Sequence, residues 1–142
     1  MNSQTSKVYL FVHVITCVKN KEPLLTKPVR TVLFAHIKKH ATENGINVLS
    51  VNGTDDHMHA VVQMMPTQNL AQIMKSIRTD STTWINEGNF IKSHFEWEEG
   101  FAALSVSPSG IKQVLEYLDK QEEHHKTKTL DSELEVFQKI QI

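Results

Sequence analysis

The alternation of apolar and polar positions divides the chain into short strands and longer helices. Residues 7–18 (KVYLFVHVITCV) are rich in β-branched and aromatic types, which predicts a strand. Apolar side chains then recur at helical spacing over 29–44, with Pro28 placed in the first turn. Asn44 and Gly45 tolerate positive φ, so the helix should end there.

The middle of the chain predicts a hairpin followed by a second helix. Strands are expected over 46–52 and 57–65, and the residues between them, Gly-Thr-Asp-Asp, have turn chemistry. Strands separated by so short a turn should pair as an antiparallel hairpin. An apolar stripe then predicts a helix over 69–87, which Gly88 closes.

The last part of the chain predicts a fourth strand and a third helix. Residues 101–106 have strand composition, and Ser107-Pro108-Ser109 then opens a helix running to about residue 125. The tail from residue 129 has the pattern of a further amphipathic helix.

This order of elements predicts an α+β fold of the ferredoxin-like sandwich type. One four-stranded antiparallel sheet should carry two crossover helices on one face, followed by a tyrosine-bearing helix near the C-terminus. The other face of the sheet is expected to be free for a partner or an active site. We interpret the 142 residues as a single domain with a core over about 7–125 and a tail over 126–142.

Composition excludes several classes of protein. The chain is 39% hydrophobic, which is enough to bury a core, and no apolar run approaches the roughly 18 residues of a membrane span. The polar N-terminus and the single cysteine, Cys17, favour a cytoplasmic protein without disulfides or a membrane partner. The net charge is −1, so any nucleic-acid site must be concentrated locally.

The tripeptide His57-Met58-His59 is the first candidate for chemistry. Side chains alternate along a strand, so both histidines should point to one face and offer two imidazoles to a divalent metal. Either Asp55 or Asp56 could accept the second ring N–H of a ligating histidine. The plainer interpretation is two solvated histidines that follow a turn.

A second candidate lies on the third predicted helix. Tyr117 and Gln121 are one turn apart, and His124 follows in nearly the same direction. A tyrosine hydroxyl can attack a phosphodiester, and an amide oxygen can bind Mg²⁺ or Mn²⁺. The alternative is an amphipathic tyrosine at the edge of the core, with Gln121 and His124 in solvent.

Taken together, these motifs resemble the single-tyrosine HUH transposases of the insertion-sequence-200-like family, including their REP-associated relatives. The matching segments run in order from His13 to His125. They read HVITCVKNKEPLL, GTDDHMHAVVQMMP, LAQIMKSIRTDSTTWI, FEWEEGFAALSVSPS and VLEYLDKQEEHH. The His-x-His strand and the Tyr-x-x-x-Gln helix are specific only in combination. The chain departs from the expected pattern at Phe101, where a tyrosine is usual, and in its acidic pair Glu98-Glu99.

The resemblance implies a metal-dependent enzyme that nicks and rejoins single-stranded DNA with hairpin ends. By resemblance, His57, His59 and Gln121 hold Mg²⁺ or Mn²⁺, and Tyr117 forms a 5′-phosphotyrosine intermediate. Asp56 and His124 are possible auxiliary groups, His124 for proton transfer. No nucleotide cofactor is expected, because the covalent bond conserves the phosphodiester energy and no phosphate-binding loop is present.

The DNA contacts expected from the sequence are basic. They are Lys19 and Lys21 after the first strand, and Lys75 and Arg78 on the second helix. Each could equally be a solvated surface charge.

The resemblance also implies a homodimer in which the tyrosine helix docks on the partner subunit. Two features of the chain favour this. The strand over 7–18 is apolar, and as an exposed sheet edge it would pair with a second copy. The segment 107–110 could act as a hinge for the tyrosine helix. The alternative is a monomer whose helix folds back.

Two other functions stay open from the sequence. One is a non-catalytic or domesticated module of the same fold that binds single-stranded nucleic acid and stacks bases on Tyr9 and Phe11. The other is a zinc-dependent hydrolase, although no glutamate stands at the usual metalloprotease spacing.

Overall fold

The structure, a computed structural model, describes residues 6–120. Its elements are β1 (Leu10–Cys17), the 3₁₀ turn η2 (Lys19–Lys21), α1 (Lys27–Glu43), β2 (Asn47–Gly53), β3 (His57–Met64), α2 (Leu70–Glu87), β4 (Ala102–Val106) and α3 (Ile111–Asp119). Every strand and helix expected within this range is present, and most bounds are shifted by no more than a few residues. Helix α3 is the exception: it ends at Asp119 rather than near residue 125, because Lys120 leaves the helical conformation with φ −107° and ψ 25°. The amphipathic helix expected from residue 129 lies outside the described residues.

Three helix ends follow the expected local chemistry. Pro28 occupies the first turn of α1. The Asn69 side chain accepts a hydrogen bond of 3.2 Å from the backbone N–H of Gln72 and so caps α2. Gly45, directly after α1, has a φ of 73°, a conformation that costs glycine little.

The four strands form one antiparallel sheet in the order β2-β3-β1-β4. This order, with α1 and α2 as crossovers, confirms the α+β sandwich. It also corrects the expectation that the first strand is an exposed edge. β1 lies inside the sheet and pairs with β3 on one side and β4 on the other. Its apolar sequence therefore reflects burial, and the edges among the described strands are β2 and β4.

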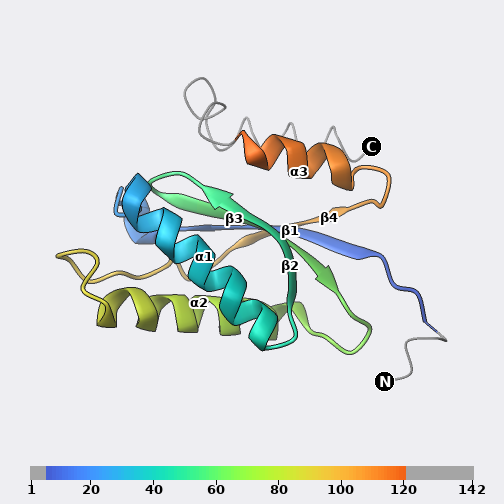
Figure 1. Cartoon of the computed structure of the whole chain (residues 1–142), viewed down its shortest axis with the longest axis horizontal. Helices are drawn as coiled ribbons and strands as arrows, with labels where there is room; N and C mark the ends of the chain where they lie inside the picture. The colour runs from blue at the N-terminus through green and yellow to red at the C-terminus, as the bar shows by residue number, and fades with distance from the viewer. Residues whose placement is uncertain (1–5, 121–142) are drawn as a thin grey trace.

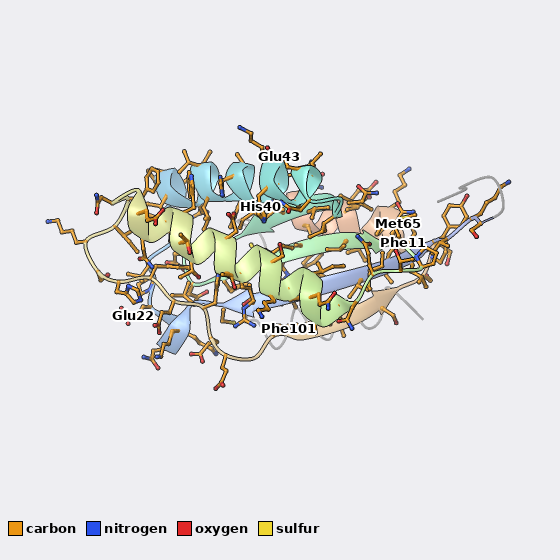
Figure 2. All side chains as sticks on the ribbon, turned by 90° about the horizontal axis from the view of Figure 1, so that it is seen from below. Phe11, Glu22, His40, Glu43, Met65 and Phe101 are labelled. Carbon is orange, nitrogen blue, oxygen red and sulfur yellow. The ribbon has the colours of Figure 1, made fainter. Side chains whose placement is uncertain are left out.

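Helices α1 and α2 lie side by side over one face of the sheet (Figures 1 and 2). The main core fills the space between them and the strands. Leu33 and Ile37 from α1, Ile77 from α2, and Met58 and Val62 from β3 are among its fully or almost fully buried members. No helix in the described part of the chain combines the length and apolarity needed to cross a membrane.

The two helices also meet through a polar contact. His36 Nε2 on α1 lies 2.8 Å from a carboxylate oxygen of Asp80 on α2, and the His36 ring stacks on Trp84 with centroids 4.3 Å apart. On α1 the next residue, Ile37, is buried in the core, whereas His36 makes the polar contact with α2.

The opposite face of the sheet is not free, contrary to the sequence expectation. Helix α3 packs there (Figure 1), and a second apolar cluster lies under it. Val61 and Val106 from the strands meet Val114, Tyr117 and Leu118 from the helix. The sheet is therefore covered on both faces, by α1 and α2 on one side and by α3 on the other.

Candidate active site

His57 and His59 lie together on the α3 side of β3. Their residues are 3% and 0% exposed, and their ring centroids are 5.0 Å apart in an edge-to-face arrangement. Met58, between them, faces the main core under α1 and α2. The strand alternation expected from the sequence therefore places both imidazoles on one face. Because both are buried, the interpretation of solvated surface histidines does not hold.

Asp56 holds the His57 ring. The Asp56 carboxylate accepts a hydrogen bond of 2.6 Å from His57 Nδ1, and the Thr54 hydroxyl lies 3.1 Å from the same nitrogen. The backbone N–H of Val18, just after β1, donates to the Asp56 carbonyl at 2.8 Å and ties this turn to the sheet. With Nδ1 engaged by a carboxylate, Nε2 is the nitrogen of His57 suited to bind a metal.

Gly53 allows the β2–β3 turn to close tightly against His57. A Cβ atom at residue 53 would collide with the backbone carbonyl oxygen of His57. Only glycine avoids this contact, so the turn that presents His57 depends on the absence of a side chain.

His59 is held by a different neighbour. His13 Nε2 on β1 and His59 Nδ1 share a buried hydrogen bond of 2.9 Å, and the two rings lie edge to edge with centroids 5.1 Å apart. His13 is not among the candidate site residues predicted from the sequence. The available signal was a histidine at a central position of an otherwise apolar strand.

Helix α3 is attached to the sheet beside this pair. The Asn52 side chain on β2 donates a hydrogen bond of 2.6 Å to the carbonyl of Leu118. Asn52 is the register partner of His59 in the neighbouring strand. The C-terminal end of α3 therefore lies next to His59, and Tyr117, which precedes Leu118, is 9% exposed in the cluster around Val61.

A bulge in β2 makes this attachment possible. The register shifts between Val48 and Ser50, with Leu49 as the extra residue. Val48 packs with the main core, and uninterrupted alternation would turn Asn52 toward that same side. The bulge reverses the alternation, so Asn52 faces α3.

Two of the predicted site residues, Gln121 and His124, lie outside the described residues. Within 6–120, no group of three or more His, Cys, Asp or Glu side chains is arranged to hold a metal. The described part of the site thus contributes two imidazoles.

The predicted basic residues of the η2 turn lie near the His57 end of the sheet. Lys19 forms an exposed ion pair of 2.9 Å with Glu96, which raises the pKa of Lys19 and lowers that of Glu96, mainly through their hydrogen bond. Burial raises the pKa of the Cys17 thiol, and the charge of Lys21 opposes that shift. Cys17 is the register partner of His57, so Lys21 lies within electrostatic range of this end of the site.

Lys75 and Arg78 lie in the other layer of the molecule. They line a groove of about 480 Å³ between α2 and the segment before β4, together with Glu96 and Trp97. The Arg78 guanidinium lies 5.8 Å from the ring centroid of Phe101, and burial lowers its pKa. Figure 2 shows Phe101 beside α2. Glu96 also pairs with Lys19, so Lys19, Lys75 and Arg78 lie on one connected surface. The residues that line this groove do not include His57 or His59.

The comparison with protein families decides the classification. Residues 6–121 match the family model described as "Transposase IS200 like". The chain belongs to this family. The match spans β1 to α3 and thus includes His57, His59 and Tyr117.

Known proteins and structures agree with membership of the IS200-like transposases. The ISDra2 transposase TnpA of Deinococcus radiodurans is 24% identical over 120 residues, covering 77% of this chain and 81% of that protein. A crystal structure of a candidate transposase from the same organism superimposes with a TM-score of 0.67 at 20% identity, covering 85% of this chain and 98% of the other. A REP-associated tyrosine transposase bound to a REP hairpin gives a TM-score of 0.60 at 12% identity, covering 81% and 69%. At these identities, the two structures establish the fold of the present IS200-like transposase.

The geometry also bears on the two alternative functions. A base-stacking module needs an open sheet face, but Phe11 packs in the cluster under α3 and only Tyr9 is exposed, at 60%. A zinc hydrolase usually takes three protein ligands of the His, Cys, Asp or Glu type, and no such group lies within residues 6–120. Neither alternative gains support from the described part of this IS200-like transposase.

Proposed function

We propose that this chain cleaves and rejoins single-stranded DNA through a covalent bond to Tyr117, assisted by a divalent metal. The observation that carries the proposal is the convergence of three elements on one sheet face. The turn before β3 and the neighbouring strand hold the rings of His57 and His59. The contact from Asn52 to Leu118 sets the end of the Tyr117 helix beside them.

We propose Mg²⁺ or Mn²⁺ as the cation, held by two imidazoles and one amide oxygen. Each imidazole has its Nδ1 occupied by a neighbour, so Nε2 of His57 and Nε2 of His59 are the atoms suited to ligation. Gln121, four residues after Tyr117 in the sequence, would supply the third ligand through its amide oxygen. Such a cation, when bound, would polarise the scissile phosphate and stabilise the departing oxygen.

Tyr117 would carry the covalent step. Its hydroxyl oxygen bonds to the scissile phosphorus as its proton passes to solvent or a nearby base, and the bond from phosphorus to the 3′-oxygen breaks. The departing strand takes up a proton as a 3′-hydroxyl, and the protein keeps the 5′-phosphate. Attack by another 3′-hydroxyl reverses the step and restores Tyr117. No nucleotide cofactor is required, because the number of phosphodiester-type bonds stays constant.

Single-stranded DNA with a hairpin is the substrate class that we propose. A structurally similar protein, the REP-associated tyrosine transposase, is seen bound to a REP hairpin. The groove that holds Lys75 and Arg78 offers two cationic side chains on one surface, next to the ion pair of Lys19 with Glu96, in a chain of net charge −1. Lys21 would add charge at the end nearer His57.

The deciding experiment is a search for the covalent adduct. The protein is incubated with labelled single-stranded DNA carrying candidate end hairpins and Mn²⁺, denatured, and analysed by gel and peptide mass spectrometry. We expect a phosphopeptide containing Tyr117. Tyr117→Phe should lose the adduct entirely while keeping its fold and DNA affinity, because only the hydroxyl is removed.

Tyr9→Phe is the matched control, since Tyr9 is the other of the chain's two tyrosines and is exposed just before β1. This variant should form the adduct as the wild type does. An adduct that persists in Tyr117→Phe would exclude the proposed nucleophile. DNA binding without any adduct across all hairpins would instead favour a non-catalytic or domesticated binding module.

A further inference from the structure

His13 stands out because its place in the fold calls for an apolar residue. It is 0% exposed in the middle of β1, and its register partners on either side are Val61 and Leu104. Burying an imidazole costs free energy unless its nitrogens find partners. A leucine or valine would fill this position without that cost, so packing alone does not account for a histidine.

We infer that His13 is a positioning residue that fixes the tautomer and ring orientation of His59 for metal binding. The inference rests on the proposed function, which makes His59 a ligand. The observation that supports it is the buried hydrogen bond of 2.9 Å between His13 Nε2 and His59 Nδ1. His13 does for His59 what the Asp56 carboxylate does for His57.

The shared hydrogen bond determines which nitrogen carries the proton. One of the two nitrogens must donate and the other must accept. For His59 to bind a metal through Nε2, its proton must sit on Nδ1 and point to His13, which then accepts through Nε2. The opposite arrangement, with His13 donating, would place the His59 proton on Nε2 and block ligation. His13 therefore has to be the acceptor.

The two imidazoles would thus have unequal partners. His57 donates to an anionic carboxylate, while His59 donates to a neutral ring whose plane is inclined to its own by 28°. A neutral acceptor orients His59 without placing a second negative charge beside the metal ligands.

The first test reads the tautomer in the metal-free wild-type protein. Nitrogen-15 NMR of the histidine side chains should show His59 protonated at Nδ1 and unprotonated at Nε2, and His13 unprotonated at Nε2. A His59 ring protonated at Nε2 would overturn the inference, and this measurement depends on no variant.

The second test compares two variants of nearly equal size. Gln at residue 13 keeps an acceptor oxygen near the position of Nε2, whereas Met has none. We expect His13→Met to weaken Mn²⁺ binding, measured by electron paramagnetic resonance, by about 10- to 100-fold. His13→Gln should stay close to the wild type. His36→Phe, which removes a histidine from the α1–α2 contact, controls for loss of an imidazole elsewhere.

The outcomes separate the inference from the proposed function. If the wild type binds no Mn²⁺ and forms no adduct, the proposed metal site fails. If the wild type binds Mn²⁺ and the Met and Gln variants bind it equally well, His13 is a packing residue only. Folding of each variant is checked by thermal unfolding, and a variant that does not fold leaves the wild-type tautomer as the deciding measurement.

Discussion

The Asp56 side chain fixes the orientation of the His57 ring. Its carboxylate holds His57 Nδ1 at 2.6 Å, so we expect Asp56→Ala to let the ring rotate and to weaken Mn²⁺ binding by about 10- to 100-fold. The neighbouring Asp55 is exposed, and its structural contact is a backbone one, the carbonyl that accepts from the Leu25 N–H. Asp55→Ala is therefore the control and should bind Mn²⁺ normally. Equal losses in both variants would point to a general charge effect.

Gly53 is the residue on which the turn geometry depends. A methyl group there would meet the His57 carbonyl oxygen, so Gly53→Ala should lower the free energy of unfolding by about 1 to 3 kcal/mol. The same change at Gly100, where a Cβ would meet nothing within 4 Å, should have little effect. Urea denaturation of the two variants makes the comparison. A stable Gly53→Ala protein would show that the turn has room to relax.

At the level of the helices, α2 presents the basic groove. Lys75→Ala and Arg78→Ala should each weaken binding of single-stranded DNA, and each should reduce the slope of log affinity against log salt by about 0.7 for every phosphate that the variant no longer neutralises. Lys38→Ala, an exposed lysine on α1, is the control and should change neither quantity. Fluorescence anisotropy over a series of salt concentrations provides both readouts. An unchanged slope in all three variants would remove the groove from the DNA path.

Lys19 differs from these residues because Glu96 already binds it. Since Lys19 lowers the pKa of Glu96, the carboxylate stays ionised at neutral pH, and the pair is lost only as the pH falls through that lowered pKa. Glu96→Gln removes the competing charge at all pH values. We therefore expect Glu96→Gln to strengthen DNA binding at pH 7 and Lys19→Ala to weaken it less than Lys75→Ala does. Weaker DNA binding by Glu96→Gln would contradict this account.

For the assembled protein, we propose a homodimer that pairs through strand β4 rather than through β1. β1 is internal, but β4 is an edge strand without a charged residue, Ala-Ala-Leu-Ser-Val. An uncharged edge readily pairs with a second copy. Light scattering of the 16.2 kDa chain at micromolar concentration should give about 32 kDa. Ala103→Lys, at an exposed position of this edge, should shift the protein toward the monomer, whereas Ala35→Lys on α1 should not.

The position of Tyr117 within such a dimer is a separate question. In this structure α3 rests on its own sheet through the Asn52 contact and a small apolar cluster. Exchange of α3 between subunits, with residues 107–110 as hinge, would recreate the same contacts, so its cost in free energy is small. We expect a mixture of His57→Ala and Tyr117→Phe proteins to regain cleavage through composite sites. Absence of cleavage in the mixture would place each site within one chain.

Local patterns were enough to predict the elements and much of the chemistry. Helical periodicity gave α1 and α2, and turn residues gave the β2–β3 hairpin. Strand alternation put His57 and His59 on one face, and the place of Asp55 and Asp56 just before the strand predicted that one of them would hold a histidine ring. The structure shows that this residue is Asp56 and that the ring is that of His57. Each of these inferences depends on residues within one or two turns of each other, where covalent geometry restricts the possible arrangements.

What only the tertiary structure decided depends on contacts between distant parts of the chain. The sequence pattern of an apolar strand does not distinguish an internal position in a sheet from an edge position. The position of β1 is therefore known only from its pairing with β3 and β4. The bulge at Leu49 reverses the side on which Asn52 lies, and alternation alone would have placed it wrongly. His13 and His59 are 46 residues apart, and only the sheet register brings their nitrogens to 2.9 Å. The sequence thus determined which groups are available, while the pairing of remote strands and the docking of α3 determined which of them meet.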